Sequence, residues 1–263
     1  MFECVVNISE GRDATVLDEL DAAVAGALLD RHSDPHHHRS VFTLVGADAP
    51  RALAARAVEL IDLRHHDGVH PRIGVVDVVP FVALDGSTAA EAVAARDAYA
   101  RWSADTLGVP CFLYGPERTL PEVRRGAFAT LAPDTGGPHP HETAGASAVG
   151  QREVLVAYNV WLADADLDLA RRVAREIRAP NLRTLGLMVG DRAQVSMNLV
   201  APGELGPEAA FDAVASRAAV AGAELVGLLP RRVLEAAPRH RWAELDLADD
   251  RTIEARLEAL GHR

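Results

Sequence analysis

The sequence predicts an α+β protein made of two α/β subdomains, each a ferredoxin-like sheet with helices on one face. Apolar runs of strand length alternate along the chain with alanine-rich stretches of helical period. In the second half the expected order is strand, helix, strand, strand, helix, strand, which is typical of a ferredoxin-like split unit. The first half looks like an elaborated version of the same unit.

Four strands and three helices are expected in the first half. The strands are residues 3–9, 40–45, 73–84 and 111–114, and the helices are residues 14–29, 48–61 and 88–106. Asp13 is the expected N-cap of the first helix. Gly68 should end the second helix in a left-handed conformation. Pro80 interrupts the third strand, so we expect that strand at a sheet edge or bent at the proline.

A polar loop at residues 133–142 has almost nothing to bury and is the best candidate for a domain boundary. We therefore expect an N-terminal subdomain at 1–135, a linker at 136–152 and a C-terminal subdomain at 153–263. The C-terminal elements are strands at 154–160, 183–189, 194–199 and 224–228, helices at 167–177 and 207–221, and a helical region from residue 231.

Charge and composition limit the kinds of molecule that this protein is expected to bind. The formal charge is −11 and the basic residues are scattered, so nucleic acid would be repelled. No apolar stretch approaches the roughly 20 residues of a membrane helix, and the N-terminus lacks signal-peptide order. Cys4 and Cys111 lie in apolar runs and are expected to be buried thiols, which indicates the cytoplasm. We expect small-molecule partners, with a homodimer as the protein assembly to consider.

Eleven histidines gather mainly in three clusters, at residues 32–38, 65–70 and 139–141. Consecutive histidines point in divergent directions, and the spacings match neither a His-Glu-x-x-His helix nor a Cys/His finger. We therefore predict no metal site. Solvated loop histidines are the default interpretation of four members of these clusters, His36, His37, His65 and His66.

His70 differs from the other histidines because Pro71 follows it. A residue before proline is kept out of the helical region, so the backbone there should be extended and stiff. Imidazole can accept and return a proton near neutral pH. Arg72 should face the same side in an extended segment. The pair suits a site that binds a carboxylate and moves protons, although a lone histidine is more often a packed or exposed residue.

Three asparagines, Asn7, Asn159 and Asn198, each follow an apolar strand sequence. One interpretation is that asparagine is simply a suitable residue for leaving a strand. The other is that the three amides project into a shared cleft and hold a polar ligand. Both interpretations remain open at this stage.

Several motifs resemble those of glutamate formiminotransferases, in the same order and over most of the chain. The most specific is Gly-Val-His-Pro-Arg-Ile-Gly-Val-Val-Asp-Val-Val-Pro-Phe at residues 68–81. The others are Glu-Cys-Val-Val-Asn-Ile-Ser-Glu-Gly-Arg at 3–12, Leu-Leu-Asp at 28–30, Arg-Ser-Val-Phe-Thr-Leu-Val-Gly at 39–46, Leu-Tyr-Gly at 113–115, Ala-Gly-Ala-Ser-Ala at 144–148, Ala-Tyr-Asn at 157–159, Gln-Val-Ser-Met-Asn at 194–198 and Leu-Val-Gly-Leu-Leu-Pro at 225–230.

The resemblance implies transfer of a formimino group from formiminoglutamate to tetrahydrofolate, with ligands in a groove between two subdomains. It makes His70 the catalytic residue. It also implies that the loop at 136–145 binds folate, through Gly136, Gly137, His139, His141, Thr143 and Gly145. We add Arg39 and Arg72 as candidates for clamping carboxylates and Asn7 for orienting the substrate. An ion pair of Arg39 with Asp30 or Asp34 is the alternative.

The chain departs from the vertebrate bifunctional enzyme of this family at three places. Val69 replaces an acidic residue before the catalytic histidine, His32 replaces an aspartate, and Pro-His-Pro-His-Glu replaces an aromatic-containing folate loop. We also expect this chain to be too short to carry the cyclodeaminase domain that is fused in that enzyme. Two other functions compete with transfer, namely a ligand-binding module without catalysis and a metal-dependent hydrolase built on the histidine clusters.

Overall fold

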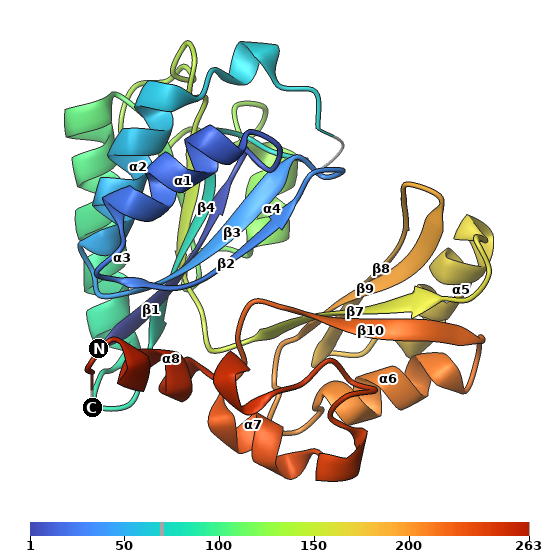
Figure 1. Cartoon of the computed structure of the whole chain (residues 1–263). Coiled ribbons are helices and arrows are strands. Elements are labelled where there is room, and N and C mark those ends of the chain that lie inside the picture. The colour runs from blue at the N-terminus through green and yellow to red at the C-terminus, as the bar shows by residue number, and fades with distance from the viewer. Residues whose placement is uncertain (69–70, 263) are drawn as a thin grey trace. The chain divides into compact units, whose positions relative to one another are not determined.

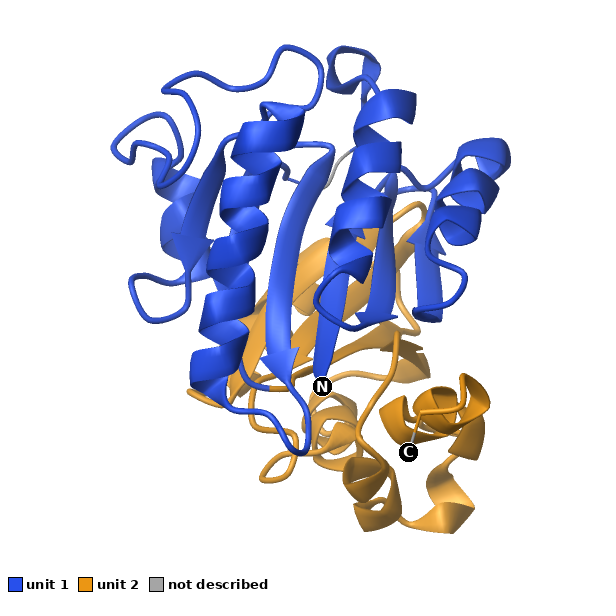
Figure 2. Ribbon diagram, turned by 90° about the vertical axis from the view of Figure 1, so that its left-hand side faces the viewer, with its two compact units in different colours: residues 1–153 blue, residues 154–263 orange. Residues whose placement is uncertain are grey.

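The computed structural model describes residues 1–68 and 71–262. The chain forms two compact units, residues 1–153 and residues 154–263 (Figure 2). Each unit has its own sheet and its own hydrophobic core. In the described part of the chain, no helix has both the length and the apolar character needed to cross a membrane.

Unit 1 is built on a six-stranded sheet in the order β2-β3-β1-β4-β6-β5. Its strands are β1 (Phe2–Ile8), β2 (Leu28–Asp34), β3 (Arg39–Val45), β4 (Val76–Ala83), β5 (Cys111–Tyr114) and β6 (Ser147–Gln151). Strands β2, β3, β1 and β4 pair antiparallel in the ferredoxin-like order. Parallel pairing adds β6 to β4 and β5 to β6. The prediction of an elaborated ferredoxin-like unit is confirmed.

Helices cover both faces of this sheet to different extents (Figure 1). The helices of unit 1 are α1 (Ala14–Ala23), α2 (Ala49–Leu60), α3 (Ala89–Trp102) and α4 (Leu120–Gly126), with short helical turns at Leu63–His65 and Ser103–Leu107. Helices α1, α2 and α3 pack on one face around Val6, Phe42 and Phe81. Helix α4 packs on the other face, where its residue Val123 and the β5 residue Phe112 belong to one buried cluster.

Helix α1 begins as predicted, because the carboxylate of Asp13 accepts hydrogen bonds from the first amides of the helix. The prediction was wrong about its end, since the helix stops at Ala23 and strand β2 follows. The sequence of β2, Leu-Leu-Asp-Arg-His-Ser-Asp, has apolar residues only at its start. An edge strand needs little apolar surface, so the hydrophobic pattern did not reveal it.

The prediction for Gly68 was also wrong. Helix α2 ends at Leu60, and Gly68 does not have a positive φ. Glycine is required there by close packing instead, because an added Cβ would lie 2.6 Å from both the carbonyl oxygen of His37 and the Cβ of His38. The turn that contains Gly68 is therefore pressed against the first histidine cluster.

Pro80 lies in an internal strand and not at the edge of the sheet. Strand β4 is flanked by β1 and β6. The antiparallel register with β1 pairs Phe81 with Cys4 and Val78 with Asn7, and shows no pair at Pro80 among the described residues. Proline cannot donate to a ladder, and the interruption of the register accommodates it.

Unit 2 has a four-stranded antiparallel sheet in the order β10-β7-β9-β8. The strands are β7 (Val156–Leu162), β8 (Leu182–Val189), β9 (Arg192–Leu199) and β10 (Val220–Val226), and the helices are α5 (Leu167–Ile177), α6 (Pro207–Ala215), α7 (Arg231–Ala236) and α8 (Ile253–Ala259). Short helical turns at Arg239–Arg241 and Asp249–Arg251 lie between α7 and α8 in the chain. The order of strands and helices confirms the ferredoxin-like prediction.

Helices α5 and α6 pack on one face of the unit 2 sheet, around Tyr158, Val195 and Phe211. The prediction extended α6 to residue 221, but the helix ends at Ala215 and β10 begins at Val220. The alanine-rich sequence between these positions has no clear period, so it does not separate a helix from a strand.

Candidate active site

The predicted base, His70, lies outside the described residues, but the backbone on both sides of it is described. On one side, the carbonyl oxygen of Gly68 accepts a hydrogen bond from the guanidinium of Arg72. On the other, the carbonyl oxygen of Pro71 accepts one from Nη1 of Arg124 at 3.0 Å. An arginine side chain therefore holds the backbone on each side of this position.

Two stacked histidines support the turn at Gly68. The rings of His38 and His66 lie with their centroids 4.1 Å apart. The amide of Gly68 donates to Nδ1 of His66 at 3.1 Å, and Nε2 of His66 lies 3.0 Å from the carbonyl oxygen of His38. These bonds assign a neutral His66 with its hydrogen on Nε2. Burial, and then the charge of Arg72, lowers the pKa of His66 and favours this neutral form.

The buried carboxylate of Glu10 links the N-terminal motif to the first histidine cluster. Its Oε1 accepts hydrogen bonds from the amides of Gly11 (2.8 Å), Arg12 (2.7 Å) and Asp13 (3.0 Å). Nδ1 of His38 lies 3.3 Å from the same oxygen. The loop before α1 and the loop before β3 are therefore fixed against each other.

Asn7 and Arg39 are brought to the same face of the unit 1 sheet. Asn7 is paired with Val41, and Arg39 lies two residues before Val41 on β3. Side chains two residues apart on a strand share a face. This face is opposite the one on which Val6 and Phe42 pack against α1, α2 and α3.

Arg39 and Arg72 share an electrostatic environment. Burial lowers the pKa of Arg39, while the carboxylate of Asp77 raises it and the charge of Arg124 lowers it further. Burial also lowers the pKa of Arg72. As for Arg39, the carboxylate of Asp77 raises this pKa and the charge of Arg124 lowers it. Asp34, which faces Arg39 in the register of β2 and β3, also raises the pKa of Arg39. The two predicted carboxylate clamps thus gather near Asp77.

Asp77 and Arg124 belong to this site, although the sequence prediction did not include them. Asp77 is only 1% exposed and its Oδ1 accepts hydrogen bonds from the amide of Ile73 (2.8 Å) and from Nη1 of Arg124 (2.7 Å). Its second oxygen pairs with Nη2 of Arg124. A single acid within the apolar run of β4 was the available signal for Asp77. Nothing in the sequence distinguishes Arg124 from the neighbouring arginine of α4.

The end of the predicted folate loop pairs directly with the segment that follows Arg72. Gly74 and Gly145 form an antiparallel bridge, and the amide of Ala146 donates to the carbonyl oxygen of Ile73 at 2.9 Å. A Cβ at Gly74 would lie 2.0 Å from the carbonyl oxygen of Ala146, so only glycine permits this approach. Two segments about seventy residues apart in the sequence therefore form one local structure.

A cavity of about 380 Å³ opens beside this junction. Its lining residues are Leu63, Arg64, Ile73, Arg124, Ala127, Phe128, Pro140, His141, Glu142 and Gly145. Two predicted folate-binding residues, His141 and Gly145, are thus in the lining. The other four are not among its described lining residues, and they are Gly136, Gly137, His139 and Thr143.

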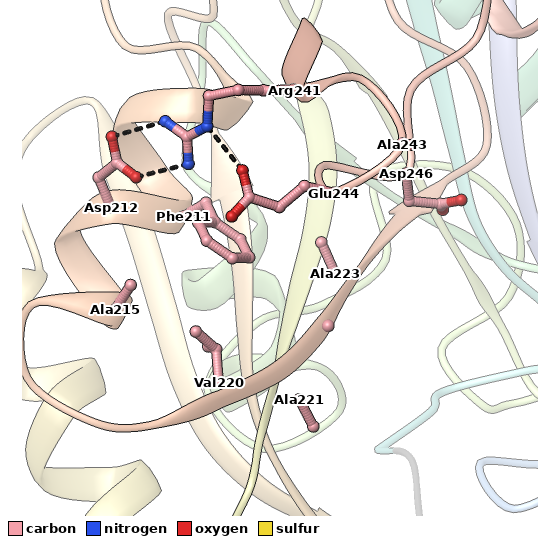
Figure 3. Close-up of a pocket in the computed structure, with 11 residues that line it drawn as sticks. Phe211, Asp212, Ala215, Val220, Ala221, Ala223, Arg241, Ala243, Glu244 and Asp246 are labelled. Atoms are coloured by element: carbon pink, nitrogen blue, oxygen red, sulfur yellow. Dashed lines mark hydrogen bonds and ion pairs between the residues drawn. The ribbon is translucent and has the colours of Figure 1, made fainter.

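A second cavity, of about 590 Å³, lies in unit 2 between α6, β10 and residues 241–246 (Figure 3). Arg241 lines it, but its guanidinium is already bound by the carboxylates of Asp212, Glu208 and Glu244. An arginine occupied by three acids is not available to bind an anionic substrate. This cavity therefore does not resemble a carboxylate site.

The remaining predicted amides lie in unit 2. Asn159 and Asn198 share one face of the sheet, because Asn159 pairs with Ser196 on β9 and Asn198 lies two residues further along that strand. Nδ2 of Asn159 donates to the carboxylate of Glu224 at 3.0 Å. Within residues 1–68 and 71–262, no group of three or more potential metal-binding side chains is found.

Comparison with known proteins identifies the family. Residues 1–152 match the formiminotransferase domain, N-terminal subdomain. A protein of Streptococcus pyogenes named glutamate formimidoyltransferase is 38% identical, over 89% of this chain and 90% of that protein. A protein of Thermoplasma acidophilum with the same name is 33% identical, over 89% of each chain.

A longer relative also matches. The formimidoyltransferase-cyclodeaminase of Sus scrofa is 32% identical over 89% of this chain, which covers 51% of that protein. The matched family model spans more than half of this chain, and the two shorter relatives match along most of their length. The chain therefore belongs to the formiminotransferase domain family.

Proposed function

We propose that this chain is a glutamate formimidoyltransferase. It transfers the formimino group of N-formimino-L-glutamate to tetrahydrofolate, giving 5-formiminotetrahydrofolate and glutamate, a reaction of histidine degradation and one-carbon metabolism. Family membership and the names of the Streptococcus pyogenes and Thermoplasma acidophilum relatives support this activity. The structural observation that carries it is the hydrogen bond between Ile73 and Ala146, which joins the His-Pro-Arg segment to the predicted folate loop.

His70 is the proposed base. The amine of tetrahydrofolate attacks the amidine carbon, and a new carbon–nitrogen bond forms. The attacking nitrogen loses a proton, and the bond from the same carbon to the nitrogen of glutamate breaks as that nitrogen gains a proton. One imidazole can perform both proton transfers in turn, because it accepts and returns a proton near neutral pH. No metal takes part in this scheme.

Arg39 and Arg72 are the proposed binders of the substrate's carboxylates, and Asn7 is proposed to orient the substrate. A guanidinium can hold a carboxylate by two parallel hydrogen bonds. The shared influence of Asp77 on Arg39 and Arg72 supports their joint use. The position of Asn7 on the same sheet face as Arg39 supports its inclusion.

The loop at 136–145 is the proposed folate-binding segment, and we assign the folate's ring system to the cavity of about 380 Å³ at its end. Ile73 and Phe128 offer apolar surface there, and His141 offers a polar group. The guanidinium of Arg64 is held by the carboxylates of Asp62 and Glu142 and is not counted among the groups that bind the folate. Ligand sites of this kind combine apolar walls with a few polar groups. We keep the predicted residues of this loop that lie outside the lining as proposed contacts for the rest of the folate, and they are Gly136, Gly137, His139 and Thr143.

We place the enzyme in the cytoplasm and consider a homodimer as its assembly. Cys4 and Cys111 are buried and unpaired, and burial raises the pKa of both thiols, that of Cys111 to about 11. Unreactive free thiols fit a reducing compartment.

The test is a transfer assay with purified full-length chain, formiminoglutamate and tetrahydrofolate. We expect 5-formiminotetrahydrofolate and glutamate in equal amounts, and no product when either substrate is left out. Calorimetry with each substrate accompanies the assay. Binding of both substrates without any product would refute the transferase and favour a binding module of the same fold.

A further inference from the structure

We propose that Asp77 and Arg124 form a positioning pair that fixes the Pro71–Ile73 backbone for the transfer reaction. Neither residue is assigned contact with a reacting atom. They act through the segment that carries Arg72 and that follows His70. The inference rests on the proposed function, because it concerns turnover at the same site.

The first observation is how the pair holds the segment. The carboxylate of Asp77 accepts a hydrogen bond from the amide nitrogen of Ile73 at 2.8 Å, and Nη1 of Arg124 donates one to the carbonyl oxygen of Pro71 at 3.0 Å. The same Nη1 lies 2.7 Å from Oδ1 of Asp77. One ion pair therefore holds an amide and a carbonyl two residues apart, which restricts both the position and the rotation of the peptide units between them.

The second observation concerns the elements of the fold on which Asp77 and Arg124 lie. Asp77 lies on β4, in the middle of the unit 1 sheet, and is 1% exposed. Arg124 lies near the end of α4, which packs against the sheet through Val123. The segment is thus attached to two rigid elements, one through each partner. Sites built on rigid elements keep their geometry better than sites held by loops alone.

The third observation is that the backbone of this segment is also held on the other side. The guanidinium of Arg72 donates a hydrogen bond to the carbonyl oxygen of Gly68, and the amide of Ala146 donates one to the carbonyl oxygen of Ile73. Asp77 and Arg124 contribute an ion pair to this set of contacts. Its removal should loosen the segment, while the bonds donated by Arg72 and by the amide of Ala146 remain.

The charges also favour this role. Asp77 and Arg124 both act on the guanidinium groups of Arg39 and Arg72. A carboxylate already neutralised by Arg124 leaves the other two arginines able to attract the substrate's carboxylates. Without Arg124, the carboxylate of Asp77 would compete with the substrate for Arg72.

The experiment compares Arg124→Gln, Arg124→Lys and Asp77→Asn with the wild-type full chain. For each, kcat and KM are measured with both substrates, and hydrogen exchange reports protection of the Ile73 amide. Because misplacement of a catalytic group by about 1 Å can reduce the rate on the order of 10²-fold, we expect kcat of Arg124→Gln to fall by roughly 10-fold to 100-fold. Protection at Ile73 should fall too, and Arg124→Lys should recover part of kcat.

Arg241→Gln is the matched control. The side chain of Arg241 is 19% exposed and that of Arg124 is 20% exposed, and each guanidinium is held by both oxygens of one aspartate. Arg241 lies in unit 2, where Figure 3 shows its carboxylate partners Asp212 and Glu244. Glu208 is a third partner. We expect this variant to keep wild-type kcat even if its thermal stability falls.

Wild-type kcat in Arg124→Gln would overturn the proposal, as would an equal loss of kcat in Arg241→Gln. Should Asp77→Asn fail to fold, the Arg124 variants decide the question. A wild-type chain without transfer activity refutes the proposed function. In that case the exchange measurement still decides whether the pair holds the segment, since unchanged protection of Ile73 in Arg124→Gln contradicts it.

Discussion

The amide of Ala146 donates a hydrogen bond to the carbonyl oxygen of Ile73 at 2.9 Å. This bond connects the segment after the His-Pro-Arg motif with the end of the loop that is expected to bind folate. The adjacent bridge between Gly74 and Gly145 continues the pairing. A displacement of either segment should therefore be transmitted to the other, and several predictions depend on this connection.

Replacement of His70 by alanine should lower kcat by about 10²- to 10⁴-fold, which is the usual contribution of a general acid–base group. Steady-state transfer assays with both substrates measure the effect. The control is His65→Ala, because the side chain of His65 is 82% exposed. Near wild-type turnover of a folded His70→Ala protein would remove His70 from the mechanism.

Arg72→Lys should raise the KM for formiminoglutamate by roughly 10-fold, because lysine keeps the charge but loses the fork that binds a carboxylate and the carbonyl oxygen of Gly68. The KM for tetrahydrofolate should change less. Arg101→Lys, an exposed position on α3, serves as the control. An unchanged KM for formiminoglutamate in Arg72→Lys would count against the clamp.

Gly74→Ala should destabilise unit 1 by about 1–3 kcal/mol, the typical cost of inserting an extra group into a packed region. The added Cβ would lie 2.0 Å from the carbonyl oxygen of Ala146, and it must push the two segments apart. Urea unfolding and transfer assays should both show a loss. Gly26→Ala is the control, since no atom lies within 4 Å of a Cβ there. Equal stability of the two variants would contradict the close approach.

Phe128→Ala should raise the KM for tetrahydrofolate severalfold, if an aromatic contact with the ligand contributes the usual energy of about 0.5–1.5 kcal/mol. Phe128 lines the cavity of about 380 Å³ and is 37% exposed. Leu260 has the same exposed fraction and does not line this cavity, so Leu260→Ala is the matched control. A KM for tetrahydrofolate that stays at the wild-type value would place the folate ring elsewhere.

The free energy of unfolding should fall as the pH is lowered below the ordinary histidine pKa of 6.5, in part because of His66. Burial lowers the folded-state pKa of His66, so the unfolded chain binds the proton more readily. The stability that His66 contributes is complete above pH 6.5 and is lost as the pH falls through the folded-state pKa. Protonation also removes the acceptor for the amide of Gly68.

Urea unfolding at about pH 7.5 and about pH 5.5 measures this dependence. Between the two pH values, the free energy of unfolding of His66→Asn should change less than that of the wild type. The exposed control His65→Asn should show the same change as the wild type. The same pH dependence in the wild type and in His66→Asn would show that other groups cause it.

Much of the fold could be predicted because local patterns are sufficient for it. Helix α5 has the predicted bounds, Leu167–Ile177, since its apolar residues follow a helical period closely. Strand β5 also has its predicted bounds, Cys111–Tyr114. Strand β2 was missed because its residues are largely polar. For Pro80 we predicted a sheet edge or a bend, and the internal position was not expected because the parallel strand β6 beyond it was not foreseen.

By itself, the sequence determined the alternation of strands and helices and the motifs that indicate formimino transfer, because these depend on residues close together in the chain. The tertiary structure decided which distant residues meet. It placed Asp77 and Arg124 around the Pro71–Ile73 backbone and brought residue 145 to residue 74. Contacts of this kind arise when strands are ordered in a sheet and helices pack on it, and neither spacing nor composition specifies that arrangement.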